Sequence, residues 1–174
     1  MGTEPVDDTP YEVIKPPTTL KSKVRELNRR EAAKFDPVKS AEAALTRLSA
    51  NFGSWMANEA QALGTAWQAI ADRGSDADTV NALYQAAHNI KGQALTLGYP
   101  LVGQVAARFC YLLEALPAPH LLPLPLTATY VETIRAMVAE GARDEDNKTG
   151  AELLATLSDM TDAAVNDLPA RENQ

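Results

Sequence analysis

Apolar residues recur every three or four positions through most of the chain, which is the spacing of one face of an α-helix. The pattern is longest over 36–73, where it begins at Asp36 and Pro37, residues that suit a helix N-cap and first turn. We predict one long helix there, and Gly53 and Gly64, which each weaken a helix by about 1 kcal/mol, mark the places for a kink. Its apolar positions are Ala41, Ala44, Leu45, Leu48, Phe52, Trp55, Met56, Leu63, Trp67 and Ile70.

Four further helices follow from the same spacing. The first begins at a cap, Ser75 or Asp76, and ends before a Gly-Tyr-Pro turn. The second is apolar almost all round, so we expect it at the centre of the fold, and a connector with four prolines, 116–126, separates it from the others. The short loops predict an all-α fold, an antiparallel four-helix bundle with additional flanking helices. The four helices are expected over about 76–97, 101–116, 126–141 and 148–166.

The two ends of the chain lack this pattern. Residues 1–19 hold four prolines among acidic residues and threonines, and we expect a flexible tail. Residues 20–35 favour helix but are almost wholly polar, so we predict a basic helix that covers the end of the bundle, dimerises or meets an acidic partner. The predicted bundle then occupies 36–166, and 167–174 form a second tail.

Charge and composition narrow the class of protein. The 174 residues are 45% hydrophobic and 6% aromatic, which is typical of a globular protein and favours packed helices over strands. The net charge of −7 argues against nucleic acid as the main partner. No apolar run is long enough to span a membrane, and the single cysteine, Cys110, has no disulfide partner. We therefore expect a cytoplasmic protein that binds neither nucleic acid nor membrane, with Cys110 an inert core residue.

The predicted helix 76–97 carries the candidate chemistry. On a helical wheel its large core-forming residues fall opposite His88, which predicts that His88 points to solvent. Tyr84 and Leu95 share its face, and solvation alone does not explain such large apolar side chains around an exposed imidazole. Two roles stay open for them, a docking patch or support for a neighbouring helix. The whole face consists of Asn81, Tyr84, Gln85, His88, Lys91, Gly92 and Leu95.

Lys91 and Gly92 suit a histidine that carries an anion. Lys91 follows His88 by three residues, close enough for its ammonium group to neutralise an anionic group on the ring. Gly92 is costly inside a helix, and the absence of a side chain there lets another protein approach the imidazole. The second histidine, His120, lies in the proline-rich connector without a lysine at this spacing, so we interpret it as a loop residue.

The sequence motifs of common enzyme classes are missing. Di-iron bundles need Glu-x-x-His pairs, but Gln85 and Pro117 stand three residues before the two histidines. The sequence has no HExxH, phosphate-binding loop, dinucleotide turn or serine elbow. The acidic run 144–146 lacks the spacing of a calcium-binding loop. We therefore expect no metal site and no cofactor of its own.

Part of the helix resembles a family signature. The run Ala87-His88-Asn89-Ile90-Lys91-Gly92, followed by Gly98, is similar to the signature of histidine-containing phosphotransfer (HPt) domains of bacterial two-component phosphorelays. The similarity extends over about 37–165, through an upstream helix and an apolar helix that ends in Leu112-Leu113-Glu114. The resemblance implies a four-helix bundle in which the glycine after the motif closes the helix.

The resemblance also implies a role for each motif residue. His88 would accept a phosphoryl group from the aspartate of a receiver domain or a hybrid sensor kinase and pass it to the aspartate of a response regulator. Lys91 would lie near the phosphoryl group, and Gly92 would give clearance for docking. Magnesium and the acidic pocket would come from the partner receiver, so the chain would be a phosphoryl carrier and not an enzyme. A neutral imidazole needs no further activation at cytoplasmic pH.

Residues beside the motif bear on the choice of partner. Tyr84, Gln85 and Leu95 are the expected partner-binding residues. Gln93 and Leu95 stand where the family often has small residues, which leaves the chemistry intact and affects specificity.

We interpret the chain as a stand-alone carrier, because it shows neither a kinase nor a receiver motif. One alternative is the phosphotransfer portion of a chemotaxis-type histidine kinase, whose sequence around the histidine is similar. Another is a module that binds a receiver without being phosphorylated. For the binding module, a His88→Ala variant keeps both binding and signalling, whereas for the carrier it keeps binding and loses output.

Overall fold

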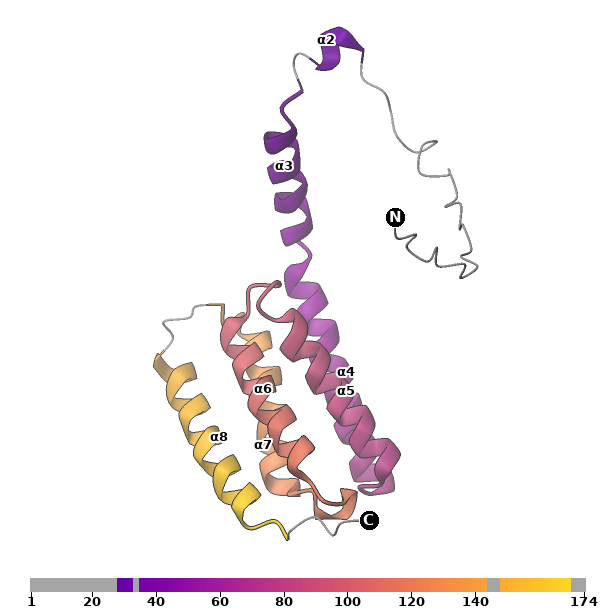
Figure 1. The fold of residues 1–174 in the computed structure, drawn as a ribbon, viewed down its shortest axis with the longest axis vertical. Coiled ribbons are helices and arrows are strands. Elements are labelled where there is room, and N and C mark those ends of the chain that lie inside the picture. The colour runs from indigo at the N-terminus through magenta and orange to yellow at the C-terminus, as the bar shows by residue number, and fades with distance from the viewer. Residues whose placement is uncertain (1–27, 33–34, 144–147, 170–174) are drawn as a thin grey trace, which may run out of the picture. The chain divides into compact units, whose positions relative to one another are not determined.

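The described part of the protein is helical. The computed structural model describes residues 28–32, 35–143 and 148–169, and within these ranges it contains helices and no strand (Figure 1). The all-α class is therefore confirmed. The chain divides into two units, Met1–Ala41 and Glu42–Gln174, and the helical bundle lies in the second.

The helices have the following bounds. They are α2 (Arg29–Ala32), α3 (Pro37–Ser49), α4 (Phe52–Arg73), α5 (Ala77–Gln93), α6 (Pro100–Ala115), the 3-10 helix η1 (Pro119–Leu121), α7 (Leu124–Ala139) and α8 (Lys148–Asn166). The helices expected over 101–116, 126–141 and 148–166 are thus found within two residues of their predicted ends. The proline-rich connector contains η1, and α7 begins early because Pro125 fits the first turn of a helix.

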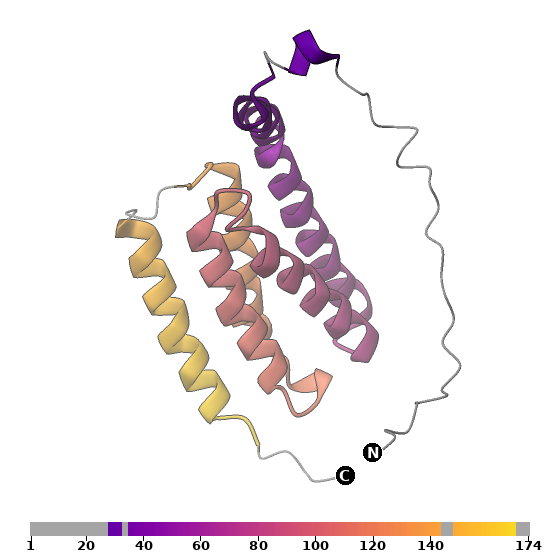
Figure 2. The ribbon, with the colours of Figure 1, turned by 45° about the horizontal axis from the view of Figure 1, so that its top comes forward.

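Four helices close into a bundle. Helix α4 packs on α5 and α7, α5 packs on α6, and α6 packs on α7. Helix α8 is added to this bundle against α6 and, over a smaller area, against α7. Figures 1 and 2 show α6 between α5 and α8 in both views. The predicted four-helix bundle with flanking helices is confirmed.

The core lies around α6, as its apolar composition predicts. Val102, Val105 and Phe109 of α6 are completely buried, and the Phe109 ring stacks on Tyr130 of α7 at 4.8 Å between centroids. The Tyr130 hydroxyl donates to the Leu157 carbonyl of α8 at 3.2 Å and shares a hydrogen bond with Thr161. Burial of these apolar surfaces is the main force that holds the bundle together.

The prediction of one continuous helix over 36–73 was wrong. Helix α3 ends at Ser49, α4 begins at Phe52, and the Asn51 amide donates to the Leu48 carbonyl in a tight turn at 2.9 Å. Helix α3 has no buried residue, so packing does not favour its continuation, and asparagine has a weak helix propensity. Gly64 lies inside α4 without interrupting it.

The helix predicted to reach about 97 ends at Gln93. A hydrogen-bonded turn follows the helix, in which the Tyr99 amide donates to the Ala94 carbonyl at 2.8 Å. Gly98 has a φ of +81°, a left-handed conformation that favours glycine, so it closes this turn as the motif implies.

Several predictions for the ends of the chain lie outside the described residues. These are the tail over 1–19, most of the basic helix over 20–35, and the last part of the tail over 167–174. Of the basic segment, the structure describes Arg29–Ala32 as helix. The predicted bundle boundary at 36 stays a prediction.

Candidate functional site

A capping box fixes the start of α5 and therefore the direction in which its side chains point. The Asp76 carboxylate accepts a hydrogen bond from the Thr79 amide at 2.8 Å, and the Thr79 hydroxyl accepts one from the Asp76 amide at 3.0 Å. The hydrogen bond from the Thr79 amide holds the pKa of the Asp76 carboxyl below its ordinary value. Thr79 is completely buried, so this cap also anchors the helix in the core.

The buried face of α5 is the one that the wheel predicts. Leu83, Ala87 and Ile90 have no exposed surface. His88 lies on the opposite side and is exposed, near the middle of the bundle's second helix. The imidazole is therefore accessible to a partner. Because His88 lies inside α5 and not in a loop, the helix backbone holds it in place.

Tyr84 lies beside His88 and is tied to the neighbouring helix. The two ring centroids are 5.7 Å apart and the rings are tilted by 34°. The Tyr84 hydroxyl donates to the Glu114 carboxylate of α6 at 2.8 Å, and this hydrogen bond raises the pKa of Tyr84. Tyr84 is half-buried, so it contacts α6 and still contributes to the surface around His88.

The other predicted site residues of this helix face lie at the surface. Gln85, Lys91 and Gly92 are exposed on α5, and Leu95 is 71% exposed in the turn that follows it. No heavy atom lies within 4 Å of the position that a Gly92 Cβ would take, so the space beside it is open. The structure thus brings His88, Lys91, Gly92, Tyr84, Gln85 and Leu95 together on one side of the bundle.

Helix α6 runs beside this face in a defined register. Glu114 lies opposite Tyr84, and a Cβ on Gly103 would lie 3.2 Å from the Ala94 Cβ, so the two helices are antiparallel. This register places the residues around Cys110 level with His88. Cys110 is completely buried, and burial raises the pKa of its thiol to about 11, as expected for an inert core residue.

A carboxylate borders the face on each side. Glu114 of α6 holds Tyr84 on one side, and on the other the Gln93 amide donates to the Glu59 carboxylate of α4 at 3.3 Å. The face therefore holds an exposed imidazole with Lys91 one turn away on the same helix, the Tyr84 ring in contact with it, and a carboxylate at each border. Sequence reasoning assigned no role to Glu114 or Glu59, because both act through contacts between helices; a lone acidic residue at the end of the apolar helix α6 was the available signal.

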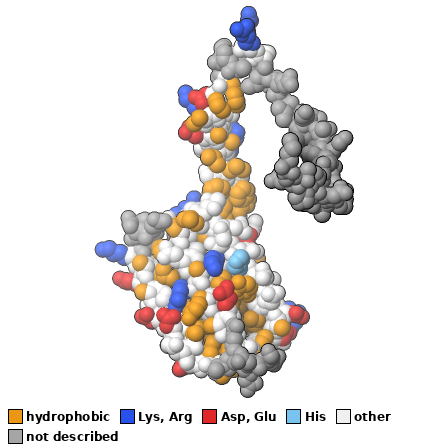
Figure 3. Space-filling model, in the orientation of Figure 1, with side chains coloured by type: hydrophobic (Ala, Val, Ile, Leu, Met, Phe, Trp, Pro, Cys, Tyr) orange, Lys and Arg blue, Asp and Glu red, His pale blue; other side chains and the backbone are white. Residues whose placement is uncertain are grey.

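A shallow depression adjoins Tyr84. Its volume is about 320 Å³, and it lies between the start of α5 and the end of α6. It is lined by Ala77, Val80, Asn81, Tyr84, Leu113, Glu114 and Pro119. Figure 3 shows histidine, basic, acidic and hydrophobic side chains close together over α5, α6 and α8 on the face drawn in Figure 1.

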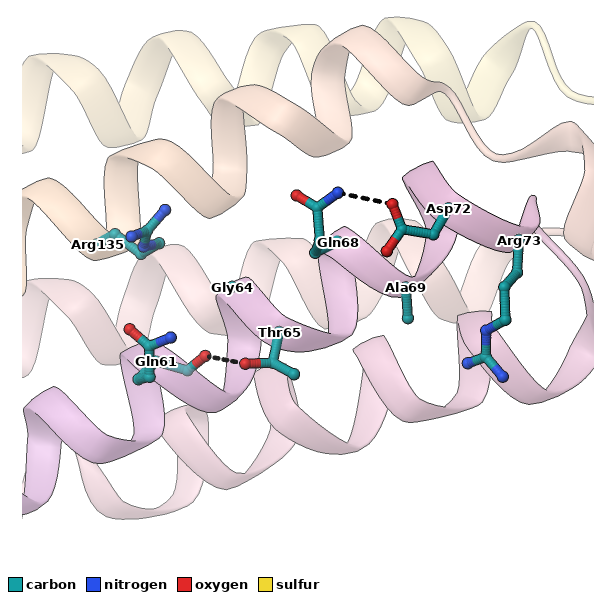
Figure 4. A pocket seen from close by; sticks show the side chains of 8 residues that line it. All are labelled: Gln61, Gly64, Thr65, Gln68, Ala69, Asp72, Arg73 and Arg135. Atoms are coloured by element: carbon teal, nitrogen blue, oxygen red, sulfur yellow. Dashed lines mark hydrogen bonds between the residues drawn. The ribbon is translucent and has the colours of Figure 1, made fainter.

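A larger groove of about 530 Å³ lies elsewhere, between α4 and α7. Arg135 of α7 reaches over Gly64 of α4, where a Cβ would lie 3.3 Å from its Nε (Figure 4). The Gln68 amide donates to the Asp72 carboxylate one turn further along α4, beside the groove, at 2.9 Å (Figure 4). None of the predicted site residues lines this groove, and His120 lies apart from it in η1, where it is exposed.

Among the residues that the structure describes, no three His, Cys, Asp or Glu side chains gather in a way that could hold a metal ion. Within the same ranges, no helix is both long and apolar enough to cross a membrane.

Comparison with known proteins identifies the family. The model of the Hpt domain matches residues 47–144, which is more than half of the 174-residue chain and includes α4 to α7. Searches of curated proteins and of solved structures found no match. Hpt domains are phosphocarrier modules of two-component phosphorelays rather than catalysts. The chain therefore belongs to the Hpt domain family, the histidine phosphotransfer modules of phosphorelays.

Proposed function

We propose that the chain is a phosphorelay intermediate and that His88 is its phosphoacceptor. The observation that carries the proposal is an exposed imidazole on the surface of α5, inside the segment that matches the Hpt domain. His120, the other histidine of the chain, lies in η1 with no lysine three residues after it. The donor is the phosphorylated aspartate of a receiver domain or hybrid sensor kinase, and the acceptor is the aspartate of a response regulator.

The transfer step needs only a nucleophile from this chain. The lone pair of a ring nitrogen of His88 attacks the phosphorus of the aspartyl phosphate, a P–N bond forms, and the P–O bond to the aspartate breaks with release of the carboxylate. The second transfer runs in the opposite sense, from His88 to the aspartate of the response regulator. The partner receiver supplies magnesium and the acidic pocket, so the chain is a carrier and has no catalytic activity of its own.

Neighbouring residues assist this step. The Lys91 ammonium group, one turn along α5, reduces the repulsion that a phosphoryl group on His88 would meet. Gly92 leaves the space beside the imidazole open for the receiver. Tyr84, Gln85 and Leu95 form the docking surface, in which the apolar side chains provide contact area and the rim carboxylates disfavour wrong partners. A cytoplasmic location is part of this proposal, because the partner receivers and kinase domains of phosphorelays act there.

The experiment that tests the proposal is intact-mass analysis after mixing the protein with phosphorylated receiver domains from the same genome. We expect one acid-labile phosphoryl adduct on the wild-type protein. It should be lost in His88→Gln and kept in His120→Gln, which controls for the loss of an imidazole elsewhere. An adduct that survives in His88→Gln contradicts the assignment.

The second candidate is a module that binds a receiver without phosphorylation. The half-buried Tyr84 and the largely exposed Leu95 favour it, because they offer a docking surface whatever happens at His88. Stoichiometric binding of a receiver with no adduct from any donor would support this candidate. In that case Gly92→Arg abolishes binding, while His88→Ala has no effect on binding or signalling.

A further inference from the structure

A group of side chains joins α6 to α8 near the His88 face. Arg108 of α6 forms an ion pair with Asp162 of α8 at 2.6 Å and donates to the Ser158 carbonyl at 3.1 Å. Its guanidinium carbon also lies 4.9 Å from the centroid of the Tyr111 ring, a cation–π contact. Tyr111 is 43% exposed, so an aromatic ring is held at the surface.

Tyr111 lies within the area that a partner centred on His88 would cover. The register of α5 and α6, with Glu114 opposite Tyr84, puts Tyr111 level with His88. Tyr111 lies one turn before Glu114 and is exposed like it, so both side chains are on the same side of α6. Axes of packed helices are about 8–10 Å apart. A standard interface covers about 800 Å² on each partner, which corresponds to a disc of roughly 16 Å radius. Tyr111 therefore falls inside a standard footprint around His88.

The Arg108 group is not what attaches α8 to the bundle. Helix α8 buries Leu157 and Thr161, and Thr161 is hydrogen-bonded to Tyr130 of α7 in the core. By contrast, the side chains of Arg108 and Asp162 are 29% and 57% exposed, so this ion pair is partly screened by solvent and adds less to the attachment of α8 than its buried residues do. Its effect is to hold the Arg108 guanidinium over the Tyr111 ring.

We propose that Tyr111 is a second contact for the receiver domain that docks over His88, and that Asp162 of α8 positions it through Arg108. The inference rests on the proposed function. An exposed aromatic ring already fixed by a guanidinium loses little conformational freedom on binding, and aromatic and arginine side chains carry much of the binding energy of interfaces. Because α8 lies outside the segment that matches the Hpt domain, it makes the choice of receiver specific to this chain.

The test uses the full chain and the receiver identified by the intact-mass screen, with initial transfer rates measured against receiver concentration. Tyr111→Ala should raise KM roughly tenfold and leave kcat unchanged, because a docking contact acts equally on ground and transition states. Tyr111→Phe keeps the ring and should keep the wild-type KM. Leu124→Ala is the matched control, since Leu124 is 48% exposed but lies on α7, which does not border the His88 face.

A second pair of variants separates positioning from attachment of α8. Asp162→Ala removes the carboxylate that orients Arg108 and leaves its hydrogen bond to the Ser158 carbonyl. It should raise KM several-fold and change Tm less than the loss of a buried contact of α8 does. Thr161→Val removes a buried hydrogen bond of α8 without touching Arg108, so it should lower Tm and leave KM unchanged. If instead Thr161→Val both lowers Tm and raises KM, and Asp162→Ala changes neither, α8 acts only through stability and the inference is overturned.

The outcomes distinguish this inference from the proposed function. If Tyr84→Ala and Leu95→Ala raise KM and Tyr111→Ala does not, the inference is overturned and the proposed function stands. If the protein binds a receiver without accepting a phosphoryl group, the proposed function fails. The inference is then tested by calorimetry: it stands if Tyr111→Ala raises the receiver Kd and Tyr111→Phe does not, and it is overturned if Tyr111→Ala leaves Kd unchanged. If it binds no receiver, both are overturned.

Discussion

Replacing Gly92 with alanine should make the fold more stable and the protein less active. Gly92 lies on α5 one turn after His88, and nothing stands within 4 Å of the position that its Cβ would take. An added methyl group therefore meets no atom of the bundle. Because glycine disfavours a helix relative to alanine, Gly92→Ala should gain about 1 kcal/mol of unfolding free energy. For a domain of this size the gain raises Tm by roughly 2–4 °C.

The same methyl group lies where a receiver must approach the imidazole. We expect Gly92→Ala to slow phosphoryl transfer several-fold and Gly92→Arg to abolish receiver binding. If Gly92 were needed only for folding, Gly92→Ala would lower the stability of the fold and would not affect receiver docking directly. The variant therefore separates a functional reason for Gly92 from a structural one.

The assay combines differential scanning calorimetry with initial rates of transfer from a phosphorylated receiver. The matched control is Gly103→Ala on α6, because its Cβ would lie only 3.2 Å from the Ala94 Cβ and would overpack the α5–α6 contact. The overpacking opposes the gain in helix propensity, so this control should gain less stability than Gly92→Ala. The reasoning is refuted if Gly92→Ala lowers Tm, or if both Gly92 variants transfer at the wild-type rate.

Three further predictions concern single side chains. Lys91→Ala should slow transfer roughly two- to fivefold, because it removes one exposed charge interaction, and quench-flow rates with an unchanged receiver Kd would check this. Tyr130→Phe leaves the buried Thr161 hydroxyl without this partner and should lower the unfolding free energy by about 1–2 kcal/mol in urea melts. The pKa of Asp76 is lower in the folded protein than in the unfolded chain, so its ionised carboxylate stabilises the fold when the pH is above the ordinary carboxyl pKa. This contribution is lost as the pH falls through the folded pKa. In thermal melts at decreasing pH, Tm should therefore fall less for Asp76→Asn than for the wild type. An equal fall in Tm would contradict the capping argument.

The sequence allowed the orientation of His88 to be predicted because a helix face depends on local spacing. Leu83 and Ile90 recur at the helical period, and the capping residue Asp76 sets the start of α5, so the opposite face follows without knowledge of the neighbours. For the same reason the bounds of α6, α7 and α8 were predicted within two residues.

Contacts between helices could not be predicted in this way. The hydrogen bond from Tyr84 to Glu114 and the ion pair of Arg108 with Asp162 join residues 30 and 54 positions apart, and they depend on a register that no local pattern encodes. The sequence marked Gly53 as a place for a kink, but a full break between α3 and α4 was not predicted, because Leu45 and Leu48 continue the helical spacing although both are exposed. Periodicity shows which face is apolar but not whether anything covers it.

The most direct test of the central claim is to locate the phosphoryl group on the chain. The protein is incubated with its phosphorylated donor receiver, digested under mildly alkaline conditions that preserve phosphohistidine, and sequenced by tandem mass spectrometry. We predict a single modified residue, His88, whose phosphoryl group disappears when an unphosphorylated response regulator is added. A phosphoryl group on His120 or on any other residue, or one on His88 that no regulator removes, would contradict the account.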